Sequence, residues 1–434
     1  MRKILLTLGL AMTVNLFAGE TLSLQLVPDR EVVLRGSPQE VVVKIDLSAL
    51  AGRKKPSHTP LNLAVVLDKS GSMTGPKLEK AKQAARQVVE RLGAKDFFSL
   101  VVYSDRAEVL VPARRVTDKE AVQERIDSIR ADGSTALFAG VRLGADQLQE
   151  YFSSKRINRV ILLSDGLANV GPSSTRDLRR LGSQLAEGGI AVTTIGVGDD
   201  YNEDLMAGLA EASDANYYYV QDTEKLPGIF AKELGEMLAV AARDVRIEIT
   251  CPAGVTPLGL VGRAERFEDQ RAIVNLSQFT LGQNRYLLLR CRVRDGQPEV
   301  ARVKVSYKDE LDNGSDQSAA GVARISFTEN RADADKSINN AVVAQKLLML
   351  TAVAKDEAMT LADKGQLKAA AVTLARQKAE LDAIYAAAPA AVQVQIRAET
   401  DNLHAFDGVL NDGSYNAATR KVMQSQSYDT RNSK

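Results

Sequence analysis

The amino-acid sequence predicts an α/β fold: a doubly wound, mostly parallel sheet inserted into a β-sandwich and followed by an α-helical C-terminal region. Between residues 61 and 242, short continuous apolar runs alternate with amphipathic segments, which is typical of strands covered on both faces. Segments with alternating apolar residues and frequent turn residues flank this region on both sides. An alanine-rich stretch with helical spacing of its leucines then follows.

The composition argues against several classes of protein. The chain has 434 residues, enough for about two to four domains, and its 45% hydrophobic and 26% charged residues are typical of a globular protein. The 56 Lys and Arg nearly balance the 55 Asp and Glu, so nucleic acid is not an expected partner. Only two histidines, His58 and His404, are available for imidazole catalysis or for zinc binding.

Residues 1–19 have the layout of a secretory signal peptide. A basic pair precedes an apolar run that ends at Phe17, and Ala18 and Gly19 supply small residues for cleavage. The run is shorter than the ~20 apolar residues that span a bilayer, and no later stretch is apolar enough to do so. We therefore expect an exported protein, periplasmic or extracellular, that is not integral to the membrane.

Two separate segments predict the β-sandwich. Residues 20–60 contain two or three weakly alternating strands and end in a basic linker at 52–60, and residues 243–330 contain short strands separated by turn signals. The first segment is too short to bury a sheet face by itself. We therefore expect both segments to form one sandwich, with the α/β region at 61–242 inserted between them.

The two cysteines of the chain lie in this predicted sandwich. Cys251 and Cys291 each share an alternating pattern with apolar neighbours, so both thiols are expected to point into the β-structure. An oxidising compartment permits a disulfide between them, and no third cysteine competes. The disulfide is favoured, and two buried free thiols are the alternative.

The α/β region is predicted from apolar runs and the helical segments between them. The segment 107–116 follows a strand after only a short turn, so we expect it to be an antiparallel edge strand. The expected strands are 63–67, 97–103, 160–163, 190–195 and 217–220. The expected helices are 76–92, 119–130, 136–152, 175–187, 203–212 and 224–242.

Residues 331–434 are expected to be α-helical. Leu367, Leu374 and Leu381 mark one face of a helix between Gly365 and Pro389, and a similar apolar face precedes it. The preferred interpretation is a helical hairpin packed on the rest of the protein. A tetratricopeptide-like peptide-binding module is the alternative, but a single helix pair gives little support for it.

Oxygen-bearing side chains gather at predicted strand ends and at one predicted helix start. The first strand of the α/β region ends in Asp68, followed by Ser70 and Ser72; Thr135 precedes a helix, and Asp165 follows another strand. Open α/β sheets bind ligands at the carboxyl ends of their strands. A set of three hydroxyls and two carboxylates suits a hard divalent cation better than zinc or copper.

These residues resemble the metal-ion-dependent adhesion site of von Willebrand factor A (VWA) domains. Asp68-x-Ser70-x-Ser72, Thr135 and Asp165 match its pieces in order and setting, and the resemblance covers about residues 61–242. It implies that the serines and the threonine contact Mg²⁺, or Mn²⁺ or Ca²⁺ in its place, while the acids act mainly through water. The whole chain also resembles bacterial exported VWA and calcium-activated chloride channel-like proteins, and its layout is similar to that of integrin β chains.

The resemblance and the donor set together predict binding rather than catalysis. Mg²⁺ prefers six oxygen ligands, so a carboxylate from Asp or Glu of a protein or peptide partner can fill an open position. Neither histidine lies in this region, and nothing near these residues resembles a nucleophile with its base. The alternatives are a metal-dependent hydrolase that uses the same ion and a structural envelope protein in which the ion only stabilises the loops.

Two glycine-rich segments of the α/β region lack a nucleotide-binding motif. Pro76 separates Gly75 from Lys77, which breaks the spacing of a phosphate-binding P-loop, and no third glycine follows Gly196 and Gly198 at the required distance. We interpret both segments as turns.

Overall fold

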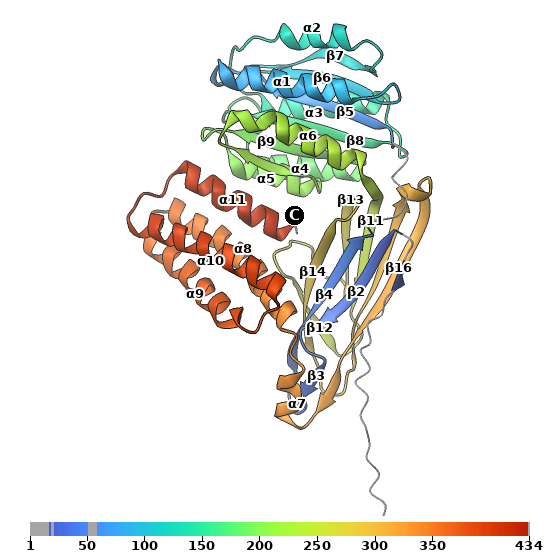
Figure 1. Cartoon of the computed structure of the whole chain (residues 1–434), viewed down its shortest axis with the longest axis vertical. Helices are drawn as coiled ribbons and strands as arrows, with labels where there is room; N and C mark the ends of the chain where they lie inside the picture. The colour runs from blue at the N-terminus through green and yellow to red at the C-terminus, as the bar shows by residue number, and fades with distance from the viewer. Residues whose placement is uncertain (1–16, 19–20, 51–58, 433–434) are drawn as a thin grey trace, which may run out of the picture.

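The structure is a computed structural model that describes residues 17–18, 21–50 and 59–432. It consists of a parallel-sheet part, a pair of packed antiparallel sheets and a group of C-terminal helices (Figure 1). The predicted signal peptide at 1–19 lies outside the described residues except for Phe17–Ala18, as do His58 and most of the linker at 52–60. Among the described helices, none is both long enough and apolar enough to cross a bilayer.

The central sheet of the parallel-sheet part has six strands in the order β10-β9-β8-β5-β6-β7. All neighbouring strands are parallel except β6 and β7, which are antiparallel, so the predicted doubly wound sheet and its edge strand are confirmed. The strands are β5 (Leu61–Asp68), β6 (Phe97–Tyr103), β7 (Ala107–Arg115), β8 (Ile157–Ser164), β9 (Ile190–Val197) and β10 (Tyr217–Val220).

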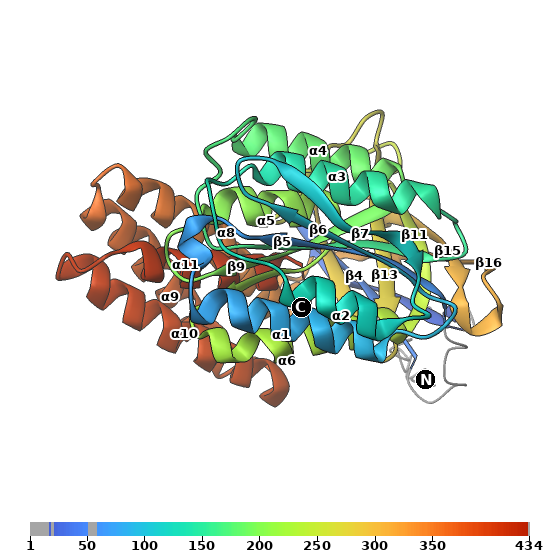
Figure 2. The ribbon, with the colours of Figure 1, turned by 90° about the horizontal axis from the view of Figure 1, so that it is seen from above.

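Helices cover both faces of this sheet, as Figure 2 shows from above. One apolar core lies beneath α1 (Pro76–Arg91), α2 (Lys119–Asp127) and α6 (Leu226–Leu238), and a second lies beneath α3 (Leu137–Glu150), α4 (Thr175–Glu187) and α5 (Glu203–Ala212). Every residue of β5 and β8 is buried. Burial on two faces explains why these strands are continuous apolar runs without alternation.

The helix predicted at 224–242 is wrong at its C-terminal end. Helix α6 ends at Leu238, and β11 (Val240–Thr250) begins two residues later. Ala242 pairs in register with Phe279 on one side and with Asp309 on the other. Alanine favours a helix intrinsically, but here two neighbouring strands supply the backbone hydrogen bonds and hold the segment extended.

The antiparallel sheets form the predicted sandwich, and they are built from the chain segments before and after the α/β region. Strand β4 pairs along almost its whole length with β14, which joins the segment before the insertion to the segment after it. Buried side chains of both sheets share one core. One sheet contains β1 (Phe17–Ala18), β2 (Leu22–Pro28), β4 (Gln39–Ala49), β14 (Asn284–Val293) and β12 (Val255–Leu260), and the other contains β13 (Arg271–Thr280), β11, β15 (Glu299–Asp309) and β16 (Ser315–Arg324). Two short parallel strands, β3 (Val32–Leu34) and β17 (Ser326–Thr328), pair separately.

Both cysteines face this shared core, as their alternating pattern predicts. Cys251 and Cys291 are buried, and their Sγ atoms lie 3.9 Å apart without a covalent bond. The favoured disulfide is therefore not formed in the structure, which has the alternative, two buried free thiols.

The C-terminal region is helical, as expected, and extends beyond the predicted hairpin. Helices α8 (Asn340–Asp363) and α9 (Leu367–Tyr385) form that hairpin, and α10 (Ala390–Asn411) packs on α9. A short α7 (Arg331–Lys336) precedes them. The last helix, α11 (Ala417–Arg431), packs on α8 and returns to α5 of the parallel-sheet part (Figure 1).

Ion pairs and a buried tyrosine fix α11 against the parallel-sheet part. Arg420 lies 2.7 Å from Glu203 and 2.8 Å from Asp204, and Lys421 lies 2.8 Å from Glu203. The hydroxyl of Tyr428 donates a 2.6 Å hydrogen bond to the carbonyl of Ala215. These polar contacts join the C-terminal helices to the start of α5 and to the loop before β10.

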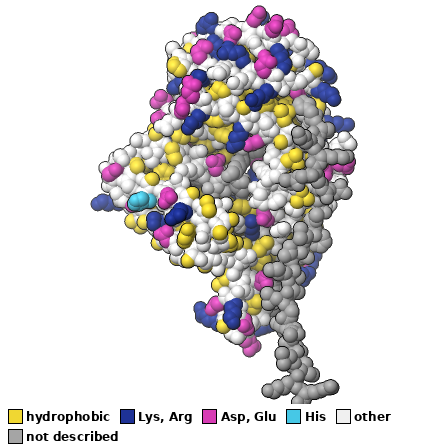
Figure 3. Space-filling view, viewed as in Figure 1, with side chains coloured by type: hydrophobic (Ala, Val, Ile, Leu, Met, Phe, Trp, Pro, Cys, Tyr) yellow, Lys and Arg dark blue, Asp and Glu magenta, His cyan; other side chains and the backbone are white. Residues whose placement is uncertain are grey.

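Charged side chains of both signs are interspersed on the face of the molecule shown in Figure 3. This distribution agrees with the net charge of +1 over the whole sequence. No block of a single sign that would attract a polyanion is visible on this face.

Helix α3 packs closely on the central strand β5 because it presents two glycines. A β-carbon added at Gly144 would lie 2.5 Å from Cγ2 of Val66, and one added at Gly140 would lie 2.7 Å from Cδ1 of Tyr103. Both distances are well below van der Waals contact, so the helix can take this position only with glycine at these sites.

We predict that Gly144→Ala lowers the free energy of unfolding by about 1–3 kcal/mol, because the added methyl overpacks a buried contact. Gly235→Ala in α6 is the matched control: a β-carbon there meets nothing within 4 Å. It should leave stability unchanged or raise it by about 0.5–1 kcal/mol, since alanine is the better helix former. Thermal and denaturant unfolding measure both changes, and equal effects of the two variants would contradict the packing argument.

Candidate metal site

The sheet brings the five predicted cation-binding residues to one edge. Asp68 ends β5, and Ser70 and Ser72 lie in the turn that follows it; Thr135 directly precedes the N-cap of α3, and Asp165 directly follows β8. Strands β5 and β8 are parallel neighbours in register. Their carboxyl ends therefore place the two acids side by side, as the sequence predicts.

Three hydroxyl groups surround one small space next to Gly166. Ser70 Oγ and Ser72 Oγ lie 3.1 Å apart. A β-carbon added at Gly166 would lie 3.0 Å from Thr135 Oγ1, 3.3 Å from Ser72 Oγ and 3.7 Å from Ser70 Oγ. Glycine at this position therefore leaves open the space on which the hydroxyls converge.

The carboxylate of Asp165 is fully buried and accepts a hydrogen bond at each oxygen. Ser72 Oγ donates to Oδ1 at 2.7 Å, and the ammonium of Lys77 donates to Oδ2 at 2.6 Å. A buried carboxylate without a counter-charge is unfavourable. Lys77 therefore supplies a positive charge that compensates the buried carboxylate of Asp165.

The carboxylate of Asp68 is held by neutral donors instead. The backbone N–H of Ser70 donates to Oδ1 at 2.8 Å, and Ser164 Oγ donates to Oδ2 at 2.8 Å. Burial raises the pKa of Asp68 above its ordinary value, although the hydrogen bonds from Ser70 and Ser164 act in the opposite direction. The side chain is oriented by fixed donors, so it has one defined position at the sheet edge.

The loop that carries Thr135 is fixed by polar contacts from its neighbours. Asp105 accepts a 2.8 Å hydrogen bond from the backbone of Ser134, and Asn169 accepts one of 2.8 Å from the backbone of Thr135. Gly133 has a φ of +69°, and a β-carbon there would lie 2.8 Å from Asp105 Oδ2. The backbone at Gly133 thus requires glycine, and the loop holds the threonine toward the serines.

Sequence reasoning missed Lys77, Asp105, Asn169 and Ser164. Lys77 carried a recognisable signal, because it stands in the first turn of α1, where the helix dipole disfavours a cation. A lysine at that position indicates a nearby acid. The other three residues are ordinary polar loop residues, and only the folded loops show which backbone groups they bind.

The donor set at this edge fits a hard divalent cation. Within the described residues there is no cluster of three or more His, Cys, Asp or Glu that could hold a metal. The site instead offers three hydroxyls and two carboxylates, all of them oxygen ligands of the kind that Mg²⁺ takes. The open space beside Gly166 is where the hydroxyls could contact such an ion.

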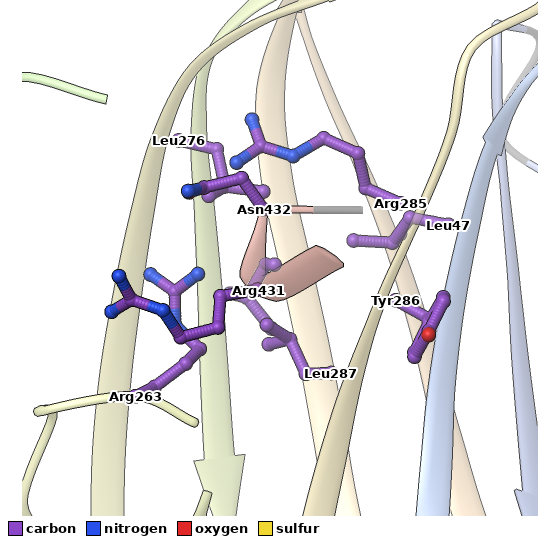
Figure 4. Close-up of a pocket in the computed structure, with 9 residues that line it drawn as sticks. Leu47, Arg263, Leu276, Arg285, Tyr286, Leu287, Arg431 and Asn432 are labelled. Carbon is purple, nitrogen blue, oxygen red and sulfur yellow. The ribbon is translucent and has the colours of Figure 1, made fainter. Parts of the chain in front are cut away.

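A second hollow lies at the junction of α11 with the sandwich (Figure 4). It has a volume of about 10 Å³, close to the space of one water, and Arg263, Arg285 and Arg431 are among its lining residues. Each guanidinium pairs with a carboxylate, at 2.5, 2.8 and 2.7 Å respectively. This hollow is a cluster of ion pairs, and it is too small to hold a ligand.

Residues 62–232 match the von Willebrand factor type A domain family. The chain therefore contains a VWA domain, and it is the parallel-sheet part that carries the five residues described above. Domains of this family typically bind a divalent metal and are mostly non-enzymatic.

Two bacterial relatives are named as uncharacterised proteins. The chain is 30% identical to YfbK of Escherichia coli over 232 residues, which cover 52% of this chain and 40% of YfbK. It is 29% identical to sll0103 of Synechocystis over 265 residues, which cover 58% of this chain and 62% of sll0103. The matched regions thus span less than two thirds of either relative.

Solved structures share the fold over most of the chain. A von Willebrand factor type A protein from Catenulispora acidiphila superposes with a TM-score of 0.71 at 20% identity and covers 91% of both chains. The ArnB paralog VWA2 from Sulfolobus acidocaldarius superposes with a TM-score of 0.66 at 18% identity, covering 95% of this chain and 98% of its own. The likeness therefore extends beyond the VWA domain to the flanking parts.

We predict that Gly166→Ala weakens Mg²⁺ binding by at least about tenfold, or 1.4 kcal/mol, because its methyl would fill the space between the three hydroxyls. Isothermal titration calorimetry of the full chain measures the affinity. Gly228→Ala in α6, where a β-carbon would meet nothing within 4 Å, is the control and should bind like the unmodified chain. Undiminished binding by Gly166→Ala would place the ion elsewhere.

Proposed function

We propose that the protein is an exported, non-catalytic binding protein that holds a protein or peptide partner through a divalent cation. The cation, Mg²⁺ with Mn²⁺ or Ca²⁺ as substitutes, would sit at a metal-ion-dependent adhesion site made by Asp68, Ser70, Ser72, Thr135 and Asp165. The observation that carries this proposal is the convergence of three hydroxyls on the space beside Gly166, next to two buried carboxylates.

The chemistry of the donor set favours binding of a carboxylate from outside. Mg²⁺ in proteins prefers near-octahedral oxygen coordination and keeps several waters. Hydroxyls of Ser70, Ser72 and Thr135 are neutral, so they leave much of the ionic charge uncompensated. An Asp or Glu side chain of a partner could replace a water and supply both a ligand and the missing negative charge.

The binding role agrees with the domain, and the exported location agrees with the N-terminus. VWA domains generally mediate protein–protein interaction or adhesion, which supports a partner-binding role for this one. The signal-peptide-like layout of residues 1–19 supports export to the periplasm or the extracellular space. Among the described residues, His404 lies in α10 and thus outside this site.

The partner should be retained in Mg²⁺ and lost in EDTA. We expect immobilised protein to capture it from an envelope extract of the producing cells in millimolar Mg²⁺ and to release it in excess EDTA. Thr135→Val keeps the side-chain shape but removes one hydroxyl, so it should abolish capture. Thr117→Val is the matched control, because Thr117 is exposed beyond the far end of β7.

Mass spectrometry of the retained proteins, compared between Mg²⁺ and EDTA, provides the measurement. Equal recovery of the same protein in both buffers, or from the Thr135→Val variant, would refute a cation-bridged contact. Turnover of an ester or phosphoester that stops in EDTA would instead favour a hydrolase that uses the same ion.

A further inference from the structure

We propose that Lys77 is a built-in competitor of the divalent cation and thereby sets the metal concentration at which the site loads. The inference rests on the proposed function, because it concerns the regulation of the same site. The lysine ammonium donates a hydrogen bond to one oxygen of Asp165. A metal ion that uses this carboxylate must share it with the ammonium or displace it.

The ion pair joins a buried carboxylate to a partly exposed lysine. Its Nζ lies 2.6 Å from Asp165 Oδ2, and the carboxylate's other oxygen already accepts from Ser72. The side chain of Asp165 has no exposed surface, whereas that of Lys77 is 27% exposed. The buried carboxylate is therefore paired with a lysine that is itself partly exposed to solvent.

Helix stability does not explain a lysine at this position. Lys77 follows Pro76 in the first turn of α1, where the backbone N–H groups and the helix dipole repel a cation. The contact with Asp165 offsets that repulsion. The position therefore places a positive charge at the metal site at a cost to the helix.

The charges of the site predict the direction of the effect. Two carboxylates, Asp68 and Asp165, belong to the candidate site, and the ammonium of Lys77 pairs with one of these charges. A divalent ion at the same place meets less attraction from the acids and direct repulsion from the ammonium. Removing the ammonium should therefore strengthen metal binding.

The loop after β9 approaches the lysine closely. A β-carbon added at Gly198, at the end of β9, would lie 3.5 Å from Lys77 Nζ and 3.6 Å from its Cε. Glycine also has a φ of +70° there. A side chain at residue 198 would therefore contact the ammonium, and glycine keeps this side of Lys77 free of such a contact.

The test compares the Mg²⁺ affinity of full-length variants by isothermal titration calorimetry. Lys77→Met should bind Mg²⁺ at least about tenfold more tightly than the unmodified chain, and Lys77→Arg, which keeps the charge, should bind within about threefold of it. Lys80→Met is the matched control: Lys80 lies on the same helix, is 26% exposed and pairs with Glu224 at 2.6 Å. Its affinity for Mg²⁺ should be unchanged.

A second measurement uses the unmodified protein and does not depend on the folding of a variant. Lysine acylation followed by peptide mass spectrometry should label Lys77 faster in saturating Mg²⁺ than in EDTA, because the ion releases the ammonium. The labelling of Lys80 should be the same in both buffers.

The outcomes separate this inference from the proposed function. Equal or weaker Mg²⁺ binding by a folded Lys77→Met variant, or Lys77 labelling that does not rise with Mg²⁺, overturns the inference while the metal site stands. No Mg²⁺ binding by the unmodified chain and by Lys77→Met overturns both proposals.

Discussion

Two carboxylates buried at one edge of the central sheet constrain the loops of the VWA domain. Ionised groups away from water are unfavourable unless each oxygen has a partner. The turn after β5 supplies the backbone of Ser70, the end of β8 supplies Ser164, and the start of α1 supplies Lys77. The paths of these segments follow from the need to satisfy Asp68 and Asp165.

The fold explains why this edge is open to a ligand. The strand order places β5 between β6 and β8, and α1, which follows β5, packs on the opposite face of the sheet from α3, which precedes β8. Such a reversal creates a crevice at the carboxyl ends of the strands. The loop before α3 approaches the same crevice from the other side, so Thr135 faces the two serines although it lies far from them in the sequence.

Sequence patterns predicted the features that depend on neighbouring residues in the chain, namely the strands and most of the helix ends. Runs without alternation identified the buried strands, and the helices at 175–187 and 203–212 begin and end as predicted. The grouping of the five site residues followed from two strand ends, one helix start and the resemblance to the VWA motif. The extended state of Ala242, the Lys77–Asp165 pair and the docking of α11 could not be predicted, because each depends on a partner that is distant in the sequence and identified only by tertiary packing.

Helix α11 joins the C-terminal region back to the VWA domain by non-covalent contacts. The polypeptide leaves the VWA domain through β11, passes through the sandwich and the C-terminal helices, and returns to α5 through Arg420, Lys421 and Tyr428. A pull on the C-terminal helices therefore reaches the VWA domain by two routes, one covalent and one through this returning helix. Tension from an attached partner would be shared between them, so the domains resist separation until the ion pairs of α11 give way.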